Sequence, residues 1–561
     1  MSVTRRINVP LVAVAVALAA AFIWVAPPEA RASSWTSRGP IAISTNTGFT
    51  LANGVTGGSG TPQDPYIISG WEISDTGPDN IYLQDTDAHV VLRHLYVHAD
   101  TPITNGIVLL NVSNGVLEDV RASESRYGLS ASASNLVVRN STFDSNAYDG
   151  IAITSSIRVQ IENNTVAANR HGLQIVGATD VTISRNTVSS NGLAAGEPSG
   201  IVVRDSTRIR IEGNSVVSNA LGGVHVETST NVSVRANTIS RTYDGMSLRG
   251  VPDAVVIENT FSNDDYAVRL VASPRSRIES NTVNSSRVGL VLEGDILGSS
   301  DDVMVVENDI ETTEIGIWVA YVRSATVSEN QFTGNGFGLG ARLVGTSEIL
   351  VHRNNFVSNR IGAEDEGGGT GNLWDEGYPR GGNYWSDYAG VDACSGPLQN
   401  DCRAPDGIGD SAYTIQGTGS DTYPRMALYL RGGPTPPAAR FSVTPSPAAV
   451  GEAVTVDASS SSDGQDPAAM LEVRWDWEGD GAWDTDWSAA KTWSHAFGAA
   501  GAYSIRLEVR DGNGMTNITT RALEIVEGRG SPWLLTIALG AGTAAAGVAA
   551  AFLYRSRRRA R

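Results

Sequence analysis

The chain is short of lysine, cysteine and positive charge. Among its 561 residues, 41 are lysine or arginine and 60 are aspartate or glutamate, which gives a net charge of −19. Lys491 is the single lysine. Proteins that bind nucleic acids need basic stripes, so this composition argues against a nucleic-acid partner. An acidic surface instead suits cation binding or a saline exterior.

The sequence is also short of soft metal ligands. Its two cysteines, Cys394 and Cys402, enclose a short polar segment and are expected to form a disulfide in an exported chain. Copper sites need imidazole or thioether ligands brought together, and the histidines and methionines here are scattered, which argues against copper. Only His94 and His98, with His89 nearby, could share a site, and a solvated strand face is the alternative.

The chain has an uncharged apolar run near its beginning. Two arginines precede the run from Leu11 to Val25, and Ala30-Arg31-Ala32 fits a cleavage site. Residues 1–32 are therefore predicted to be a secretory signal, with an uncleaved anchor as the alternative.

A second apolar run lies near the end of the chain. Residues 533–554 are long enough to span a bilayer, and the arginine-rich tail 555–561 follows at once. The positive-inside rule places this tail in the cytoplasm and residues 33–530 outside. The sequence predicts a single-pass cell-membrane protein with most of its chain extracytoplasmic.

Between the two ends, one short phrase recurs, usually every 22 residues. Each copy begins with a glycine, followed by an apolar–variable–apolar triplet such as Ile151-Ala152-Ile153. Ala267 fills one gap in the series, whose glycines are Gly106, Gly128, Gly150, Gly172, Gly200, Gly223, Gly245, Gly289, Gly316, Gly338 and Gly362. Such a period is typical of stacked copies of one supersecondary unit.

Each repeat holds three short alternating segments, which leaves no room for a crossover helix between parallel strands. Each strand must then pair with its counterpart one coil away, which predicts an all-β, right-handed parallel β-helix solenoid. We expect the asparagines that share one register to stack as a corner ladder, with a row of ligand-binding amides as the alternative. They are Asn164, Asn186, Asn214, Asn237, Asn259, Asn281, Asn308, Asn330 and Asn354, with Ser141 in the same place one coil earlier.

Three stretches resemble the NosD-like β-helix proteins: the opening Gly58–Ser74, the repeats, and Gly381–Met426 with its NYWSDY, DGIGD and YP motifs. The resemblance implies that a cap closes the solenoid. We place an N-terminal cap and the first turns at 33–105, the repeats at 106–366, and the C-terminal cap with the cysteine pair at 367–430. The founding members are periplasmic copper-associated proteins, and the wider fold includes carbohydrate-binding and sugar-cleaving β-helices.

Residues 441–527 resemble a PKD domain, through RWDWEGDG (Arg474–Gly481), SHAF (Ser494–Phe497) and LEVRDGNG (Leu507–Gly514). The resemblance implies an Ig-like β-sandwich, and the strands alternate as a sandwich requires. The proline-rich segment 431–440 is predicted to be a stiff linker between the two domains. The predicted order is therefore β-helix, β-sandwich and a single C-terminal transmembrane helix.

Stacked coils would gather the residues that precede successive glycines at one corner. These are Arg126-Tyr127, Tyr148-Asp149 and Arg170-His171. Arginine pairs with carboxylates and aromatic rings stack on sugars, so Arg126, Tyr148 and Arg170 are predicted to bind ligand. The catalytic candidates are Tyr127, Asp149, His171 and Arg170, because they could supply an acid and a base. A solvated polar corner is the alternative.

Trp318 stands at the outward-facing middle position of its triplet. It is predicted to be a sugar-stacking platform, or else to pack under the Gly294–Asp302 loop.

Calcium is the most plausible ion. Asp476, Glu478, Asp480 and Asp484 follow an EF-like oxygen spacing, although Trp487 replaces the final glutamate. Asp406 and Asp410 of the cap form a second acidic group, with Asp387 and Asp392. Ordinary Asp/Gly turn chemistry is the alternative at both places.

The leading hypothesis is a surface-anchored protein that binds or scaffolds extracellular glycans, as polysaccharide, glycoprotein or surface-layer components. One alternative is an extracellular polysaccharide lyase, epimerase or hydrolase acting at the corner, and a second is copper handling. The chain shows no known catalytic signature, which favours binding over catalysis.

Overall fold

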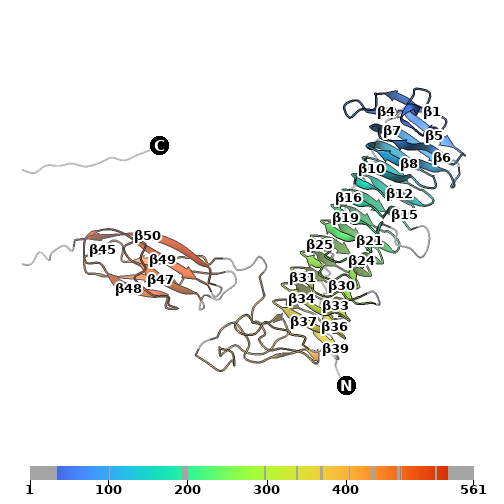
Figure 1. Cartoon of the computed structure of the whole chain (residues 1–561). Coiled ribbons are helices and arrows are strands. Elements are labelled where there is room, and N and C mark those ends of the chain that lie inside the picture. Colours follow the sequence, from blue (N-terminus) through green and yellow to red (C-terminus); the bar gives the residue numbers. More distant parts are fainter. Residues whose placement is uncertain are drawn as a thin grey trace, which may run out of the picture. The chain divides into compact units, whose positions relative to one another are not determined.

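The computed structural model describes residues 35–527, except 100, 193–199, 296–297, 336–338, 367–370, 404, 431–435, 464–467, 469–470 and 512–513. It divides into two compact units, Met1–Arg431 and Gly432–Arg561 (Figure 1). The 3-10 turn Asn46–Gly48 is the one helical segment in the described part of the chain. No helix there is long and apolar enough to cross a membrane. The predicted signal (1–32) and transmembrane helix (533–554) lie outside the described residues.

The first unit is the predicted parallel β-helix, whose 41 strands form one continuous coiled sheet. Each coil has three faces, and its strands pair in parallel with their counterparts one coil away; β3 (Val55–Gly57), near the N-terminal end, is an exception and pairs antiparallel with β4 (Tyr66–Ser69). For example, β12 (Asp149–Thr154), β13 (Ile157–Glu162) and β14 (Thr165–Ala167) pair with β15 (His171–Val176), β16 (Thr179–Ser184) and β17 (Thr187–Ser189). The strands β7 (Val90–Ala99), β9 (Gly115–Ser123) and β10 (Leu129–Arg139) each turn from one face onto the next.

The first face carries β12, β15 and their counterparts: β2 (Ile41–Ile43), β6 (Asp79–Thr86), β8 (Asn105–Ser113), β18 (Ile201–Arg204), β21 (Gly222–Glu227), β24 (Asp244–Arg249), β27 (Tyr266–Val271), β30 (Val288–Glu293), β33 (Ile315–Ala320), β36 (Leu339–Val344) and β39 (Ile361–Glu366). The second face carries β13, β16, β4 (Tyr66–Ser69), β19 (Thr207–Glu212), β22 (Thr230–Arg235), β25 (Val255–Ile257), β28 (Arg277–Glu279), β31 (Val303–Val306), β34 (Arg323–Ser328) and β37 (Ser347–His352). The third face carries β14, β17, β1 (Thr36–Arg38), β5 (Trp71–Asp75), β11 (Thr142–Asp144), β20 (Ser215–Val217), β23 (Thr238–Ser240), β26 (Thr260–Ser262), β29 (Thr282–Asn284), β32 (Asp309–Glu311), β35 (Gln331–Thr333), β38 (Asn355–Val357) and β40 (Tyr384–Trp385).

The alternating triplets build the core of the solenoid. Their first and third residues point inward, so that Ile151, Leu173 and Ile201 stack in one fully buried row. The middle residues point outward and pair with one another from coil to coil, as predicted, so that Gln174 lies between Ala152 and Val202. Burial of these aliphatic rows is the main driving force for coiling, because each coil contacts only its neighbours.

The glycine column is confirmed, with one correction: the glycine next to Gly316 is Gly340 rather than Gly338. The strand β36 pairs Ala341 with Ile317, and a Cβ added at Gly316 would lie 2.4 Å from the carbonyl oxygen of Gly340. Close contact with the next coil therefore excludes a side chain here. The triplet after Gly340 begins with the small Ala341, so its apolar pattern is weak in the sequence.

The asparagine column is a buried ladder, as predicted. The side-chain oxygen of Asn186 accepts hydrogen bonds from the backbone nitrogen and the Nδ2 of Asn164, at 2.9 and 3.0 Å. Asn186 in turn donates to Asn214 at 3.0 Å, and the same pattern repeats through Asn354 to Asn383. Saturated, buried amides of this kind hold the coils in register.

A second ladder, absent from the predictions, runs along the other end of the third face. Asn146 donates from its backbone nitrogen and its Nδ2 to Asn169 at 2.9 Å, and Asn169 pairs with Asn191 in the same way. The register continues with threonine, aspartate and serine where asparagine is missing, at Thr242, Asp264, Ser286 and Thr313. Because its members vary, this column is harder to recognise in the sequence than the first.

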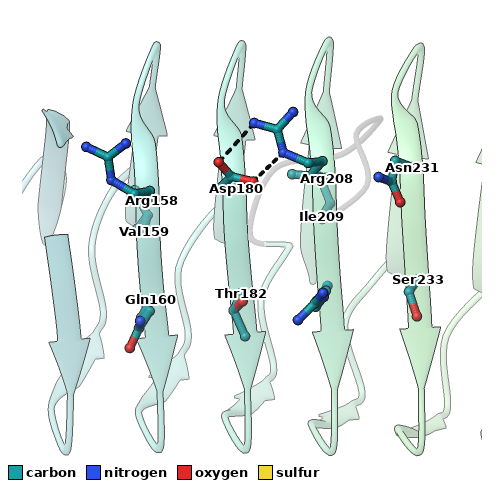
Figure 2. Close-up of a pocket in the computed structure, with 10 residues that line it drawn as sticks. Arg158, Val159, Gln160, Asp180, Thr182, Arg208, Ile209, Asn231 and Ser233 are labelled. Atoms are coloured by element: carbon teal, nitrogen blue, oxygen red, sulfur yellow. Dashed lines mark hydrogen bonds and ion pairs between the residues drawn. The ribbon is translucent and has the colours of Figure 1, made fainter. Parts of the chain in front are cut away.

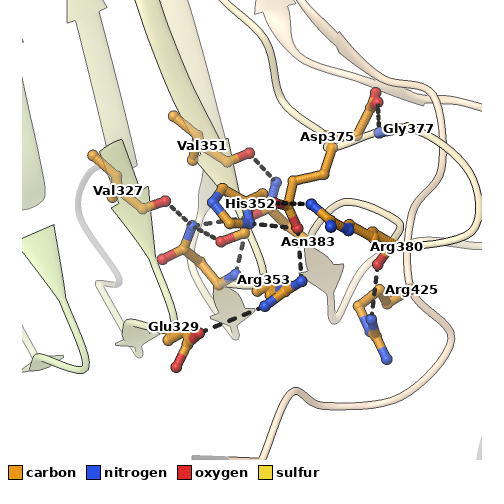
Figure 3. Close-up of polar contacts among 12 residues, drawn as sticks. Val327, Glu329, Val351, His352, Arg353, Asp375, Gly377, Arg380, Asn383 and Arg425 are labelled. Carbon is orange, nitrogen blue, oxygen red and sulfur yellow. Dashed lines mark hydrogen bonds and ion pairs between the residues drawn. The ribbon is translucent and has the colours of Figure 1, made fainter. Parts of the chain in front are cut away.

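The cap closes the C-terminal end of the solenoid with aromatic stacking and buried charge. Trp385 stacks between Phe356 and Tyr413, and its indole nitrogen donates to the buried Asp421 at 2.8 Å. At a second junction, Arg353 of the coil next to the cap bridges Glu329 and Glu376, at 3.8 and 2.9 Å. Figure 3 shows its contact with Glu329. The predicted disulfide between Cys394 and Cys402 is present in the cap.

The second unit is the expected sandwich of two sheets. One sheet contains β44 (Ser442–Thr444), β46 (Ala453–Asp457) and β48 (Thr492–Ala496). The other contains β45 (Ala448–Ala449), β50 (Thr516–Val526), β49 (Gly501–Arg510) and β47 (Glu472–Asp476). Trp475 and Phe441 meet edge to face in its core, at 5.1 Å between ring centroids.

Candidate functional site

The six residues of the predicted corner do lie together, on three successive coils. We call Arg126, Tyr127, Tyr148, Asp149, Arg170 and His171 the corner cluster. Tyr148 donates its backbone N–H to the carbonyl of Arg126, and Arg170 donates to that of Tyr148, each at 2.8 Å. The β12–β15 pairing also places Asp149 directly beside His171. Residues 22 positions apart in sequence are thus neighbours along the solenoid.

The accessible part of the corner cluster is an aromatic ring flanked by two guanidinium groups. Tyr148 is 37% exposed. Arg126 lies 5.2 Å and Arg170 lies 5.4 Å from the centre of its ring. Tyr127 packs against the same ring at 5.5 Å between centroids. Cation–π contacts hold these side chains as one surface.

The other half of the corner cluster is buried. His171 Nδ1 and Asp149 Oδ1 are 2.6 Å apart, and the two residues are 5% and 3% exposed. Burial, with the nearby charge of Asp149 as the next cause, raises the pKa of Tyr127. The Tyr127 hydroxyl therefore stays protonated and can donate a hydrogen bond at neutral pH. Both side chains of the Asp149–His171 pair therefore lie below the surface that Tyr148 exposes.

A second aromatic corner lies further along the solenoid. Tyr243 and Tyr266 meet edge to face at 5.7 Å, and Arg287 lies 4.5 Å from the Tyr266 ring. Here the arginine also faces a carboxylate, Asp265, at 3.5 Å. Burial raises the pKa of the neighbouring Asp244. The arginine of this corner is thus paired with a carboxylate, whereas Arg126 and Arg170 of the corner cluster form no ion pair with a described residue.

Trp318 is half-buried on the first face, away from the corner cluster. Arg342 of the next coil lies 5.9 Å from its ring centre. Arg342 is itself held by Glu364 at 3.5 Å and by Glu366. Trp318 therefore stays a predicted sugar platform, but it does not form one site with the corner.

The sandwich brings three of the four predicted calcium ligands together. Single oxygens of Asp476, Glu478 and Asp484 lie within 4.8 Å of one another. Asp480 turns away and accepts the backbone N–H of Ala482 at 2.8 Å.

The Asp476 carboxylate already has partners in its turn. It accepts N–H groups of Gly479 and Gly481 at 2.7 and 3.0 Å, and Arg506 approaches it at 3.1 Å. A cation would compete with these donors, so Glu478 and Asp484 are the residues most available to one. Calcium binding stays a prediction.

The acidic residues of the cap serve the turns around the disulfide. Asp410 accepts the backbone N–H groups of Ala393 and Cys394, each at 3.0 Å. Asp406 accepts those of Gly396 and Ile408. In the described part of the chain, these carboxylates do not form a group of three converging ligand atoms. These hydrogen bonds agree with the turn alternative, and calcium binding at Asp406 and Asp410 stays a prediction.

His94 and His98 on β7 have separate partners. Asp119 lies 3.0 Å from His94, and Glu72 lies 3.3 Å from His98. The imidazoles do not form a cluster of three or more metal-ligating side chains with other described residues.

One arrangement in the sandwich was not predicted. Trp487 lies between Arg474 and Arg510, at 4.4 and 4.3 Å from the guanidinium carbons, and Arg474 also lies 4.5 Å from Trp483. The signal was present in the sequence, because outward-facing strand positions carry arginine near a pair of tryptophans four residues apart. These side chains stack on one another, which stabilises the sheet face.

Comparison with known families assigns both units. Residues 199–390 match the family described as "Periplasmic copper-binding protein (NosD)", and residues 44–188 match "Right handed beta helix region". Residues 434–526 match "PKD domain". The resemblance to NosD-like β-helices and to PKD domains is thereby confirmed.

Several solved structures are similar to parts of the chain. The A-module of the mannuronan C-5 epimerase AlgE6 from Azotobacter vinelandii is 20% identical, with a TM-score of 0.42, and covers 52% of this chain and 96% of its own. The PKD1 domain of Epp from Vibrio anguillarum is 24% identical, with a TM-score of 0.14, and covers 17% of this chain and 99% of its own.

A further similar structure was solved in a study of carbohydrate-binding modules from the β-sandwich superfamily. It is 27% identical, with a TM-score of 0.16, and covers 18% of this chain. The matched region spans only 38% of the length of that protein. No curated protein matches the chain.

Proposed function

We propose that this protein binds extracellular polysaccharide through the corner cluster. One observation carries the proposal: the exposed ring of Tyr148 lies between the guanidinium groups of Arg126 and Arg170. Tyrosine and arginine are the residue types that recur at binding hot spots, because rings stack and guanidinium groups donate several hydrogen bonds.

The two arginines are free to act on a ligand. Within the described ranges, neither Arg126 nor Arg170 forms an ion pair, whereas many arginines of the solenoid face a carboxylate on a neighbouring coil. Their N–H groups can therefore donate to sugar hydroxyl or carboxylate groups while the Tyr148 ring stacks on the sugar. We also propose that the protein works outside the cell, held by its C-terminal apolar segment.

The hydrogen bond between Asp149 and His171 favours a second candidate, an enzyme that cleaves or epimerises the bound polysaccharide. A carboxylate that orients an imidazole is a recurring arrangement for a general base. Against this stands the burial of both side chains, which keeps them from a polymer lying on the surface.

A glycan array probed with the purified full-length chain tests the binding proposal. Tyr148→Ala should abolish binding by removing the stacking surface, while Tyr148→Phe should retain most of it. Tyr321→Ala is the matched control, because Tyr321 is 66% exposed and does not belong to the corner cluster. Unchanged binding by Tyr148→Ala would refute the assignment.

The enzyme candidate needs a separate readout. The bound polysaccharide is incubated with the chain and analysed for new reducing ends, unsaturated ends or inverted sugars. Products that disappear in His171→Gln would establish the enzyme, whereas their absence from the unmodified chain leaves binding as the function.

A further inference from the structure

The second face of the solenoid carries a groove, whereas the corner cluster lies just before the strands of the first face. The groove lies across β13, β16, β19 and β22 and encloses about 350 Å³, which is the size of a small ligand pocket (Figure 2). Its floor is made by outward-facing polar residues of four successive coils. Gln160, Thr182 and Arg210 are directly paired and form one row across it.

The charge of this groove is opposite to that of the chain. It is lined by Arg158, Arg208 and Arg210 but by a single acidic residue, Asp180, in a protein with a net charge of −19. Asp180 is neutralised by Arg208, which binds both of its carboxylate oxygens through two nitrogens, as Figure 2 shows. A net positive charge therefore remains on the other two arginines.

Neither of those two arginines forms an ion pair with a carboxylate that the structure describes, unlike many other arginines of the solenoid. Among the described residues, Arg158 donates only to the neutral side chain of Asn135, at 2.5 Å. Arg210 is exposed and forms no hydrogen bond or ion pair with any residue that the structure describes. By contrast, Arg275, in the same column of the second face, is bound by Asp253 at 2.8 Å.

We propose that this groove binds the anionic groups of an acidic polysaccharide, either carboxylate or sulfate ester. Arg158 and Arg210 stand two coils apart, about 10 Å along the solenoid, so they suit charges repeated along a sugar chain. Guanidinium groups bind carboxylates and sulfates through charge-assisted hydrogen bonds. Gln160 and Thr182 lie between them and can hold sugar hydroxyl groups.

The inference rests on the proposed glycan binding in one respect only, namely that a sugar chain carries the anion. The preference for an anion stands on the residues of the groove. Asp180 should limit the affinity of the groove, because its carboxylate binds the guanidinium group of Arg208, which could otherwise bind the ligand.

Binding of the full-length chain to matched pairs of polymers tests the proposal. Dextran sulfate is compared with dextran, and polygalacturonate with its methyl ester, so that only the charge differs within each pair. The chain should bind the charged member of at least one pair, and less tightly as salt is added. The pair that shows the difference identifies sulfate or carboxylate as the preferred group.

Three variants then locate the site. Replacing both Arg158 and Arg210 by alanine should weaken binding of the charged polymer about tenfold or more, because two charge-assisted contacts are lost. Arg275→Ala removes the same charge from a paired arginine and should change the affinity less than about twofold. Asp180→Asn should strengthen binding, because it releases Arg208, and asparagine tolerates the left-handed backbone there (φ 60°).

Equal affinity of the chain for charged and neutral polymers would overturn the proposal. A loss of affinity in Arg275→Ala as large as that in the double variant would also overturn the proposal, because binding would then depend on the net charge of the chain and not on the groove. Thermal unfolding of each variant confirms that it is folded. Tyr148→Ala separates this proposal from the previous one: if it has no effect while the double variant loses binding, the corner assignment fails and the groove stands.

Discussion

Asp264 should weaken the solenoid at neutral pH, and Asp264→Asn should relieve this. The residue occupies the second ladder, where its Oδ1 accepts the backbone N–H and the hydroxyl of Thr242, each at 2.9 Å. Its Oδ2 is buried without a hydrogen-bond partner among the described residues. Burial raises the pKa of this carboxyl from 3.8 to about 7.

The pKa shift sets the size and sign of the effect. Each unit of pKa is worth about 1.4 kcal/mol, so ionised Asp264 costs up to roughly 4 kcal/mol at pH 8. Because the folded-state pKa is raised, the penalty is absent below about pH 4, grows between about pH 4 and pH 7, and is nearly constant above pH 7. Asparagine keeps both bonds from Thr242. Its Nδ2 can donate to the carbonyl of Ile239, as Asn219 does to that of Val188 at 3.0 Å.

Denaturant unfolding of the full-length chain at pH 5 and pH 8 measures this prediction. Asp264→Asn should stabilise the solenoid by about 2–4 kcal/mol at pH 8 and by clearly less at pH 5. Asp265→Asn is the matched control, because the adjacent side chain is 42% exposed and paired with Arg287. Equal stability of Asp264→Asn and the unmodified chain at pH 8 would refute the reasoning.

Three further predictions concern the coil contacts, the cap and the sandwich. Gly200→Ala would place a Cβ 2.1 Å from the carbonyl oxygen of Gly223 and should destabilise the solenoid by about 2 kcal/mol or more. Gly57 has open space around it, so Gly57→Ala should leave the melting temperature unchanged in the same thermal unfolding experiment. Burial raises the pKa of Asp421 to about 7, and the indole of Trp385 donates a hydrogen bond to its ionised form. Trp385→Phe removes this donor and should lower the free energy of unfolding by about 1–2 kcal/mol at pH 8 and by less at pH 5. Equal losses of stability at both pH values would contradict this. Millimolar calcium should raise the melting temperature of the sandwich, and Asp484→Asn should abolish the rise; a rise that persists in the variant would exclude this site.

The solenoid could be predicted because its physical constraint repeats. The aliphatic triplets, the glycines and the first asparagine column each recur at nearly every coil, so one misplaced member, Gly338 for Gly340, does not disturb the rest. The second ladder could not be recognised in the sequence, because threonine, serine and aspartate can each accept the same hydrogen bond as asparagine. A column that is uniform in chemistry but mixed in residue type carries little signal in the sequence.

The candidate sites show where sequence reasoning stops. Coil spacing alone predicted that Asp149 lies beside His171 and that Arg126 and Arg170 flank Tyr148. Coil spacing could not predict that Asp149 and His171 are buried while Tyr148 is exposed, because burial depends on how neighbouring side chains pack at the corner. Likewise, residue spacing grouped Asp476 with Asp480, but the turn directs their carboxylates to different backbone N–H groups.

The first ladder gives the solenoid a direction. Each amide donates toward the cap, from Asn164 through Asn354 to Asn383, whose own backbone N–H is accepted by Asp421 at 2.7 Å. The aligned dipoles therefore end on a negative group, as they do when an anion sits at the N-terminus of a helix. A whole coil could be gained or lost anywhere between these ends without leaving a donor unsatisfied, so such proteins can change in length by duplicating or deleting single repeats while keeping the same cap.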